Sequence, residues 1–151
     1  MDIGSKAGYP ASSLSNFTPH PFELDGVSCA SMEGFLQSLK FSNPDVQREV
    51  CKLTGLAAKF RGKKRNKAWK RIQTLWWQGK AFDRHGEEYQ NLLDRAFEAL
   101  SKNESFQRAL LASGNATLGH SIGNRNPSET VLTTREFCSR LTRIREHLIK
   151  T

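Results

Sequence analysis

Three polar side chains share one stripe of a short helix that the sequence predicts between Ser31 and Phe41. Glu33, Gln37 and Lys40 are spaced i, i+4 and i+7, so a helix places a carboxylate, an amide and an amine on the same face. Leucines at positions 36 and 39 fall on another stripe and suit the core. The polar stripe is either a site for acid–base or nucleophilic chemistry or the solvated face of an ordinary amphipathic helix.

The start of this helix favours a charged carboxylate. Ser31 is a good N-cap, which puts Glu33 in the first turn beside unpaired backbone N–H groups. The helix dipole stabilises negative charge there. We therefore expect Glu33 to be ionised.

A basic stretch follows between Lys59 and Arg71. It contains eight Lys and Arg side chains, with Trp69 among them. Such a stretch is either a solvated helix face or the rim of an anion site, in which cations contact phosphate and the indole stacks on a base or sugar. The net charge of +8 likewise points to an anionic partner, either a phosphorylated small molecule or a nucleic acid.

Composition excludes several classes of protein. No apolar run is long enough to cross a bilayer, and the first residues lack a signal-peptide pattern, so we expect no membrane association and a cytoplasmic location. The three cysteines, Cys29, Cys51 and Cys138, are scattered and should be free thiols. They form no zinc-binding spacing with the four histidines, so we expect no metal and no cofactor.

The elements around the polar stripe are mostly helical. The pair Asp25-Gly26 predicts a tight hairpin near the N-terminus, the only clear β element. Residues 1–13 read as a flexible lead-in, and residues 14–151 as one mainly α (α+β) domain of six or seven helices. Three helices are predicted after the polar stripe: 44–53 capped by Asn43, 56–61 ended by Gly62, and one capped by Asn66 that turns Trp69, Ile72 and Trp76 inward. Three more follow. They are 89–100, which lies wholly in the core, one from Asn103 to Gly114, and one that starts at the capping box Thr133 to Glu136 and continues to Leu148.

Five motifs in this order resemble the NADAR family, the YbiA-like N-glycosidases, over residues 14 to about 118. They are Leu14-Ser15-Asn16-Phe17, Phe22 to Gly26, Met32-Glu33 through Gln37 to Lys40-Phe41, Leu56-Ala57-Ala58 with Arg61-Gly62, and Asn66-Lys67-Ala68-Trp69. The resemblance implies a largely helical fold that cleaves N-glycosidic bonds of phosphorylated ribosyl substrates. Its members act on ribosylamino-pyrimidine phosphates of riboflavin biosynthesis, or remove ADP-ribose from modified guanine.

The resemblance also implies roles for particular residues. Glu33 and Lys40 would be catalytic. The residues that we expect to bind substrate are Ser15, Asn16, Phe17, Gln37, Arg61, Trp69 and, from a loop that departs from the family pattern, His120. The expected partners are a phosphorylated ribosyl or ADP-ribosyl substrate and a nucleic acid that carries ADP-ribosylated guanine.

One segment departs from the family pattern. Family members commonly carry an acidic residue and a Trp-Gly pair before the last helix, whereas this chain has residues 120–127 without a tryptophan. His120 and Glu129 are the candidate replacements.

Two chemical routes stay open, with Glu33 as the base that activates water or a neutral Lys40 as the nucleophile that forms a Schiff base. The rival from another class is a non-enzymatic module that binds a nucleotide or nucleic acid through residues 59–71.

Overall fold

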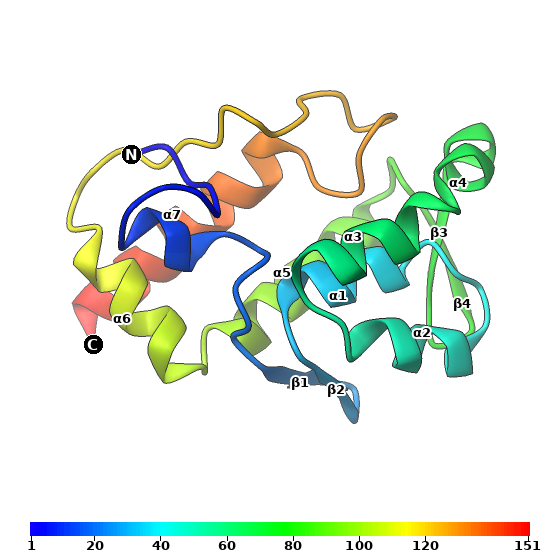
Figure 1. Cartoon of the computed structure of the whole chain (residues 1–151), viewed down its shortest axis with the longest axis horizontal. Helices are drawn as coiled ribbons and strands as arrows, with labels where there is room; N and C mark the ends of the chain where they lie inside the picture. Colours follow the sequence, from blue (N-terminus) through cyan, green and yellow to red (C-terminus); the bar gives the residue numbers. More distant parts are fainter.

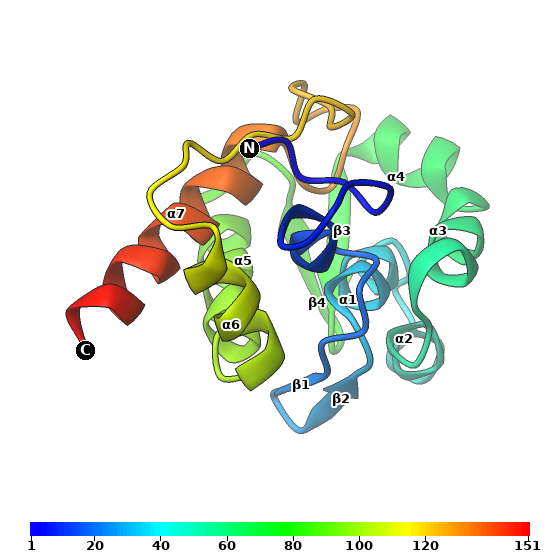
Figure 2. The same cartoon turned by 60° about the vertical axis from the view of Figure 1, so that its left-hand side comes forward.

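Helix α1 (Met32–Ser38) lies at the centre of a mainly helical domain with two small hairpins (Figures 1 and 2). The computed structural model describes all 151 residues. The expected α+β class and helix number are confirmed, since there are seven α-helices, one 3-10 helix and two antiparallel two-stranded sheets. The other elements are η1 (Ala11–Leu14), β1 (Phe22–Leu24), β2 (Val27–Cys29), α2 (Pro44–Cys51), α3 (Gly55–Lys63), α4 (Asn66–Ile72), β3 (Thr74–Trp77), β4 (Lys80–Asp83), α5 (Glu87–Leu100), α6 (Glu104–Ala112) and α7 (Thr134–Lys150).

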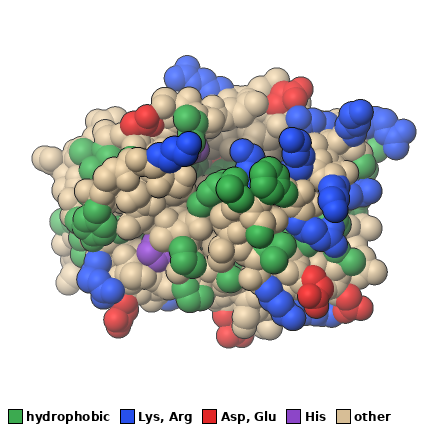
Figure 3. All heavy atoms as spheres, in the orientation of Figure 1, with side chains coloured by type: hydrophobic (Ala, Val, Ile, Leu, Met, Phe, Trp, Pro, Cys, Tyr) green, Lys and Arg blue, Asp and Glu red, His purple; other side chains and the backbone are tan.

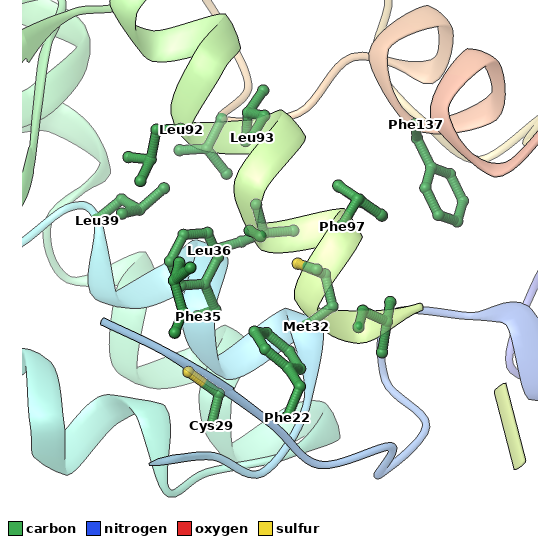
Figure 4. Packing of buried hydrophobic residues seen from close by; sticks show 14 of the residues in the cluster. Phe22, Cys29, Met32, Phe35, Leu36, Leu39, Leu92, Leu93, Phe97 and Phe137 are labelled. Carbon is green, nitrogen blue, oxygen red and sulfur yellow. The ribbon is translucent and has the colours of Figure 1, made fainter. Parts of the chain in front are cut away.

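One hydrophobic core joins α1 to α5 and α7. Figure 4 shows Phe35 and Leu36 of α1, and Leu39 directly after it, facing Leu92 and Leu93 of α5. The predicted core stripe of α5 is confirmed, because every apolar residue that the period selects is buried: Tyr89, Leu92, Leu93, Ala96, Phe97 and Leu100. Burying such a stripe is the main source of helix stability in a globular protein.

The close packing of α1 on α2 depends on a glycine. A Cβ at Gly34 would lie 2.5 Å from the carbonyl oxygen of Leu53 and 3.1 Å from that of Val50. The absence of a side chain therefore lets the end of α2 approach the backbone of α1. This contact does not cover the polar stripe of α1, and Gln37 of that stripe meets Gly62 of α3.

Four of the predicted helix starts are confirmed by their hydrogen bonds. Ser31 accepts from the backbone N–H of Gly34, and Asn43 accepts from the first turn of α2. Asn103 does the same for α6, and α7 begins with the complete capping box of Thr133 and Glu136. These local interactions satisfy donors that a helix cannot pair internally.

A second hairpin corrects the prediction for residues 66–77. Helix α4 ends at Ile72 because Gln73 adopts a left-handed conformation with φ of 53°, and Trp76 lies in β3 instead of continuing the helix. Ile72 is half exposed and does not face inward. The turn at Gln78-Gly79 has positive φ at both residues, which matches the twist of a tight hairpin.

Two helix boundaries also differ from the prediction. Gly62 lies inside α3 and does not end it, because α3 continues to Lys63. Asn66 is the first residue of α4, preceded by Arg65 as N-cap, and so it does not cap the helix. Its side chain instead accepts a hydrogen bond from Lys40, far along the chain.

The first thirteen residues, expected as a loose lead-in, pack on the domain. Ile3 is buried in the core and η1 buries Ala11 and Leu14. Asp2 forms a parallel bridge with Gly119. Figure 2 shows this N-terminal segment beside the loop that precedes α7. The N-terminal segment therefore meets residues 119–121, far along the chain.

The three cysteines are buried and free, as predicted from their spacing. None of the helices combines the length and the apolar character that crossing a bilayer requires.

Candidate active site

A cleft of about 830 Å³ lies over the polar face of α1. Helices α3 and α4 form one wall, and the loop before α7 together with the N-terminal residues forms the other. Figure 3 shows a hollow in the upper middle of this face, with hydrophobic and basic side chains at its edge. Its lining includes Ser5, Lys6, Ser15, Asn16, Phe17, Glu33, Gln37, Lys40, Leu56, Lys59, Phe60, Lys63, Asn66, Trp69, His120, Ile122, Asn124 and Glu129.

Glu33 lines this cleft from the first turn of α1. Its backbone N–H donates to the carbonyl oxygen of Asn16 at 3.0 Å, and its Oε2 accepts from Nε2 of Gln37 at 2.7 Å. Burial raises the pKa of Glu33 above its usual value, although Gln37, Lys40, Lys59 and His120 act in the opposite direction. Desolvation thus acts against the stabilisation of the charged form that was expected from the helix terminus. A carboxylate with a raised pKa is a stronger base.

Lys40 lies two residues beyond α1, at the other end of the polar stripe. Only 6% of the residue is exposed, and Nζ donates to Oδ1 of Asn66 at 2.6 Å. Burial lowers the pKa of Lys40 to about 8, with Lys70 contributing and Glu33 opposing. A substantial fraction of this amine is therefore neutral near pH 8.

The segment Ser15-Asn16-Phe17 forms the floor beside Glu33, and all three residues line the cleft. Oγ of Ser15 accepts from the backbone N–H of Phe17 at 3.2 Å, which shapes the turn. The carbonyl of Asn16 holds the start of α1, as noted above. This segment thus connects the position of Glu33 to the shape of the cleft.

Gln37 and Trp69 each carry a buried polar atom without a hydrogen-bond partner. In Gln37 it is Oε1, and in Trp69 it is the indole N–H. Both residues line the cleft, although Trp69 is 1% exposed. Unsatisfied buried polar atoms cost free energy and are uncommon in folded proteins.

The remaining predicted residues divide into two groups. His120 and Glu129, the candidate replacements in the loop, both line the cleft, and Glu129 pairs with Lys70 at 3.2 Å. Arg61 is not among the lining residues, since its guanidinium stacks over the ring of Phe41 at 4.7 Å. The fold therefore brings together eight of the nine predicted site residues, all except Arg61.

Several cleft residues were missed by sequence reasoning. Asn66 was read as a helix cap, yet it holds the amine of Lys40. Leu56 and Phe60, spaced i and i+4 on α3, form an apolar edge that is more than half exposed. An apolar pair at i and i+4 beside the basic stretch was the available signal.

A buried ion pair holds the loop wall of the cleft in place. Arg84 binds the carboxylate of Glu136 through two nitrogens, at 2.8 and 3.1 Å, and its Nε donates to the carbonyl of Thr130 at 2.9 Å. The hydroxyl of Tyr89 donates to the carbonyl of Val131 at 2.6 Å. Thr130 and Val131 line the cleft, so Arg84, directly after β4, and Tyr89 of α5 determine where the loop lies.

No group of three or more His, Cys, Asp or Glu side chains is arranged to share a metal ion.

Comparison with known proteins places the chain in a family. Residues 8–146 match the family described as bacteriophage protein GP30.3. The chain belongs to the GP30.3 family. A relative, described as an uncharacterized 17.1 kDa protein in the Gp30-rIII intergenic region of Enterobacteria phage T4, is 38% identical over 150 residues, which is 98% of each protein.

The fold of this GP30.3 family member is similar to a solved structure. The NMR structure of the E. coli protein YbiA aligns with a TM-score of 0.63 over 99% of this chain and 84% of YbiA, at 16% identity. The YbiA-like, NADAR-type resemblance that the motifs indicated is therefore confirmed for the fold.

Proposed function

We propose that this protein is an N-glycosidase that hydrolyses the C–N bond between a phosphorylated ribosyl group and a base. Candidate substrates are ADP-ribose on guanine and a ribosylamino-pyrimidine phosphate. The observation that carries the proposal is the pairing of Glu33 and Lys40 in one cleft, each with its pKa shifted by burial. Strongly desolvated titratable groups in a cleft are typical of active sites.

Glu33 suits the chemistry of this bond. Cleavage develops positive, oxocarbenium-like charge at the anomeric carbon, which a nearby carboxylate stabilises. The same carboxylate can take a proton from the attacking water. Its raised pKa increases its strength as a base, and the hydrogen bond from Gln37 fixes its orientation.

Lys40 supports a second route. A ribosyl N-glycoside can open its ring to an imine, which a neutral amine captures as a Schiff base. With its pKa lowered to about 8, Lys40 is available in the neutral form at mildly alkaline pH. Its hydrogen bond to Asn66 holds the nitrogen within the cleft lining.

The lining also suits a phosphorylated substrate. Lys6, Lys59 and Lys63 supply positive charge for phosphate oxygens. Phe17 and the half-exposed Phe60 offer aromatic faces for a base. The two kinds of group lie in the same cleft, as an N-glycoside with a phosphate requires.

Product analysis tests the proposal. The protein is incubated with ADP-ribosylated guanosine and, separately, with a ribosylamino-pyrimidine phosphate, and the released base and sugar are separated and identified. We expect turnover of at least one substrate by the wild-type protein and none by Glu33→Gln within the same time. Borohydride added during turnover distinguishes the routes, because only the Schiff-base route leaves a sugar adduct on wild type that Lys40→Ala lacks. Absence of cleavage of both substrates contradicts the proposal.

The second candidate is a non-enzymatic module for nucleotide or nucleic acid. Between Glu49 and Asp83 the chain has no acidic residue, and of the eight basic side chains in 59–71 only Lys70 forms an ion pair. Figure 3 shows Lys and Arg gathered on the right of this face, toward α4. Affinity for a single-stranded oligonucleotide that falls steeply with added salt supports this candidate, whereas a pocket enzyme that contacts one or two phosphates loses little.

A further inference from the structure

We propose that His120 is the general acid of this site and delivers a proton from Nε2 to the nitrogen that leaves the sugar. This inference rests on the proposed N-glycosidase function. It assigns a catalytic role to the segment in which the chain departs from the family pattern. The fold holds the imidazole at Nδ1, at Cδ2 and against Phe137, and leaves Nε2 without a hydrogen bond to the protein.

The first constraint fixes the tautomer of the ring. Nδ1 of His120 lies 2.8 Å from the carbonyl oxygen of Ile3. A carbonyl oxygen only accepts, so Nδ1 must carry a hydrogen in both the neutral and the charged ring. Nε2 makes no hydrogen bond with the protein and is therefore the nitrogen that gains and loses a proton.

The second constraint fixes the plane of the ring. Phe137 packs against it edge to face, with ring centroids 5.3 Å apart and planes at 78°. On the Cδ2 side lies Gly123, where a Cβ would come within 2.6 Å of the imidazole and would also overlap Oγ1 of Thr134. The backbone N–H of Gly123 donates to the carbonyl of His120 at 3.0 Å, which closes the turn.

The third constraint comes from the N-terminal residues, which lie across the loop as a strap. The carboxylate of Asp2 accepts from the backbone N–H of Ser121 at 2.7 Å and from its hydroxyl at 2.6 Å. Ile3, whose carbonyl holds the imidazole, is buried in the core. The strap, Asp2 and Ile3, therefore positions His120, which lies 117 residues after Ile3 in the chain.

The position of His120 relative to Glu33 suits complementary roles. Both residues line the cleft, and the charge of His120 acts on the carboxyl of Glu33 in the direction that opposes its raised pKa, so the two are within electrostatic range. Two groups that approach one substrate from different walls can serve as base and acid. Glu33 comes from α1 and His120 from the loop before α7.

The reaction step balances with these two groups alone. The bond between the anomeric carbon and the leaving nitrogen breaks, and its electron pair goes to nitrogen, which takes the proton from Nε2 of His120. The water oxygen forms the new bond to that carbon and releases a proton. In the water route Glu33 accepts that proton. Exchange with solvent then restores both residues to their starting forms.

Two substitutions at one position test this role. His120→Asn keeps an amide N–H where Nδ1 lies, so it can retain the bond to Ile3, but it has no acid. His120→Ala removes the whole ring. We expect each to lower kcat by about a hundredfold or more on the substrate that wild type cleaves, in the range typical of general acid catalysis. Added imidazole should restore His120→Ala at least tenfold and leave wild type unchanged. His147→Asn is the matched control, because His147 is exposed in the last turn of α7.

The possible outcomes separate this inference from the proposed function. If wild type cleaves its substrate and kcat of His120→Asn is within threefold of the wild-type value, the acid role is overturned and the N-glycosidase function stands. Failure of imidazole to rescue His120→Ala also overturns it, since a merely structural ring would not be replaced by free imidazole. An inactive wild type overturns the proposed function and this role with it. In the free protein, nitrogen NMR of His120 should show hydrogen on Nδ1 in the neutral ring, and hydrogen on Nε2 instead contradicts the geometry.

Discussion

Oε1 of Gln37 lies in the space that a Cβ at Gly62 would occupy. The Cδ and Cβ atoms of Gln37 would lie 2.7 and 3.0 Å from such a Cβ. Helix α3 can therefore close over the polar face of α1 only because residue 62 has no side chain. The same glutamine holds Glu33 through its Nε2 at 2.7 Å. The packing of the two helices and the orientation of the proposed base thus depend on one contact.

We predict that Gly62→Ala displaces Gln37 and lowers both stability and turnover. Overpacking of this kind typically costs about 1–3 kcal/mol, and loss of a fixed geometry at a catalytic group costs roughly tenfold to a hundredfold in rate. Urea unfolding and kcat for the cleaved substrate measure the two effects. Gly8→Ala is the control, because a Cβ there meets no atom within 4 Å.

A double substitution separates the two effects of that contact. Adding Gln37→Ala to Gly62→Ala removes the overlapping amide, so the free energy of unfolding should recover in part. Turnover should not recover, since Glu33 still lacks its hydrogen-bond donor. Recovery of both would show that Gln37 has no part in positioning Glu33.

Glu33→Gln should lower kcat at least about a hundredfold while folding is unaffected. Because burial raises the pKa of Glu33, the folded state favours the protonated carboxyl, and stability from this group is lost as pH rises through that pKa. Replacing the carboxyl group by a neutral amide should therefore not lower the free energy of unfolding at pH 7. Thermal unfolding at pH 7 should give a Tm no lower than that of wild type, and full activity in this variant would remove Glu33 from the mechanism.

The pH dependence of kcat/KM should show an inflection near pH 8 that belongs to Lys40. Its pKa is lowered to about 8, so the amine changes from charged to neutral as pH rises through that value. A rate that increases across this pH identifies the neutral amine as nucleophile, and one that decreases identifies the ammonium group as a cation needed for the substrate. Lys40→Met should lack the inflection. A flat wild-type profile from pH 6.5 to 9.5 would contradict both roles.

Glu136→Gln should lower the free energy of unfolding by about 3 kcal/mol at pH 7, because it leaves the buried guanidinium of Arg84 without a counter-charge. Arg84 helps to hold the pKa of Glu136 below 4.5, so this stabilisation is present above pH 4.5 and is lost as pH falls through the lowered pKa. The difference between wild type and variant in urea unfolding should accordingly shrink in acid. Glu146→Gln, on the exposed side of α7, should leave stability within about 0.5 kcal/mol of wild type.

The local elements around the site could be predicted from the sequence. The caps at Ser31, Asn43, Asn103 and Thr133 and the buried stripe of α5 are all present as expected. Each depends on residues within about four to eight positions of one another, where backbone hydrogen bonding and hydrophobic period act. The grouping of Glu33, Gln37 and Lys40 on one face is of the same kind.

The environment of those side chains was decided by the tertiary structure. The pKa of Glu33 depends on how deeply α3 and the loop bury it, and this desolvation reverses the direction that the helix terminus predicted. Asn66 meets Lys40 across 26 positions, and Ile3 meets His120 across 117. Trp76 has an apolar spacing that fits a helix, yet pairing with a second strand places it in β3. Contacts between distant segments form only when the whole core packs, so no local pattern in the sequence encodes them.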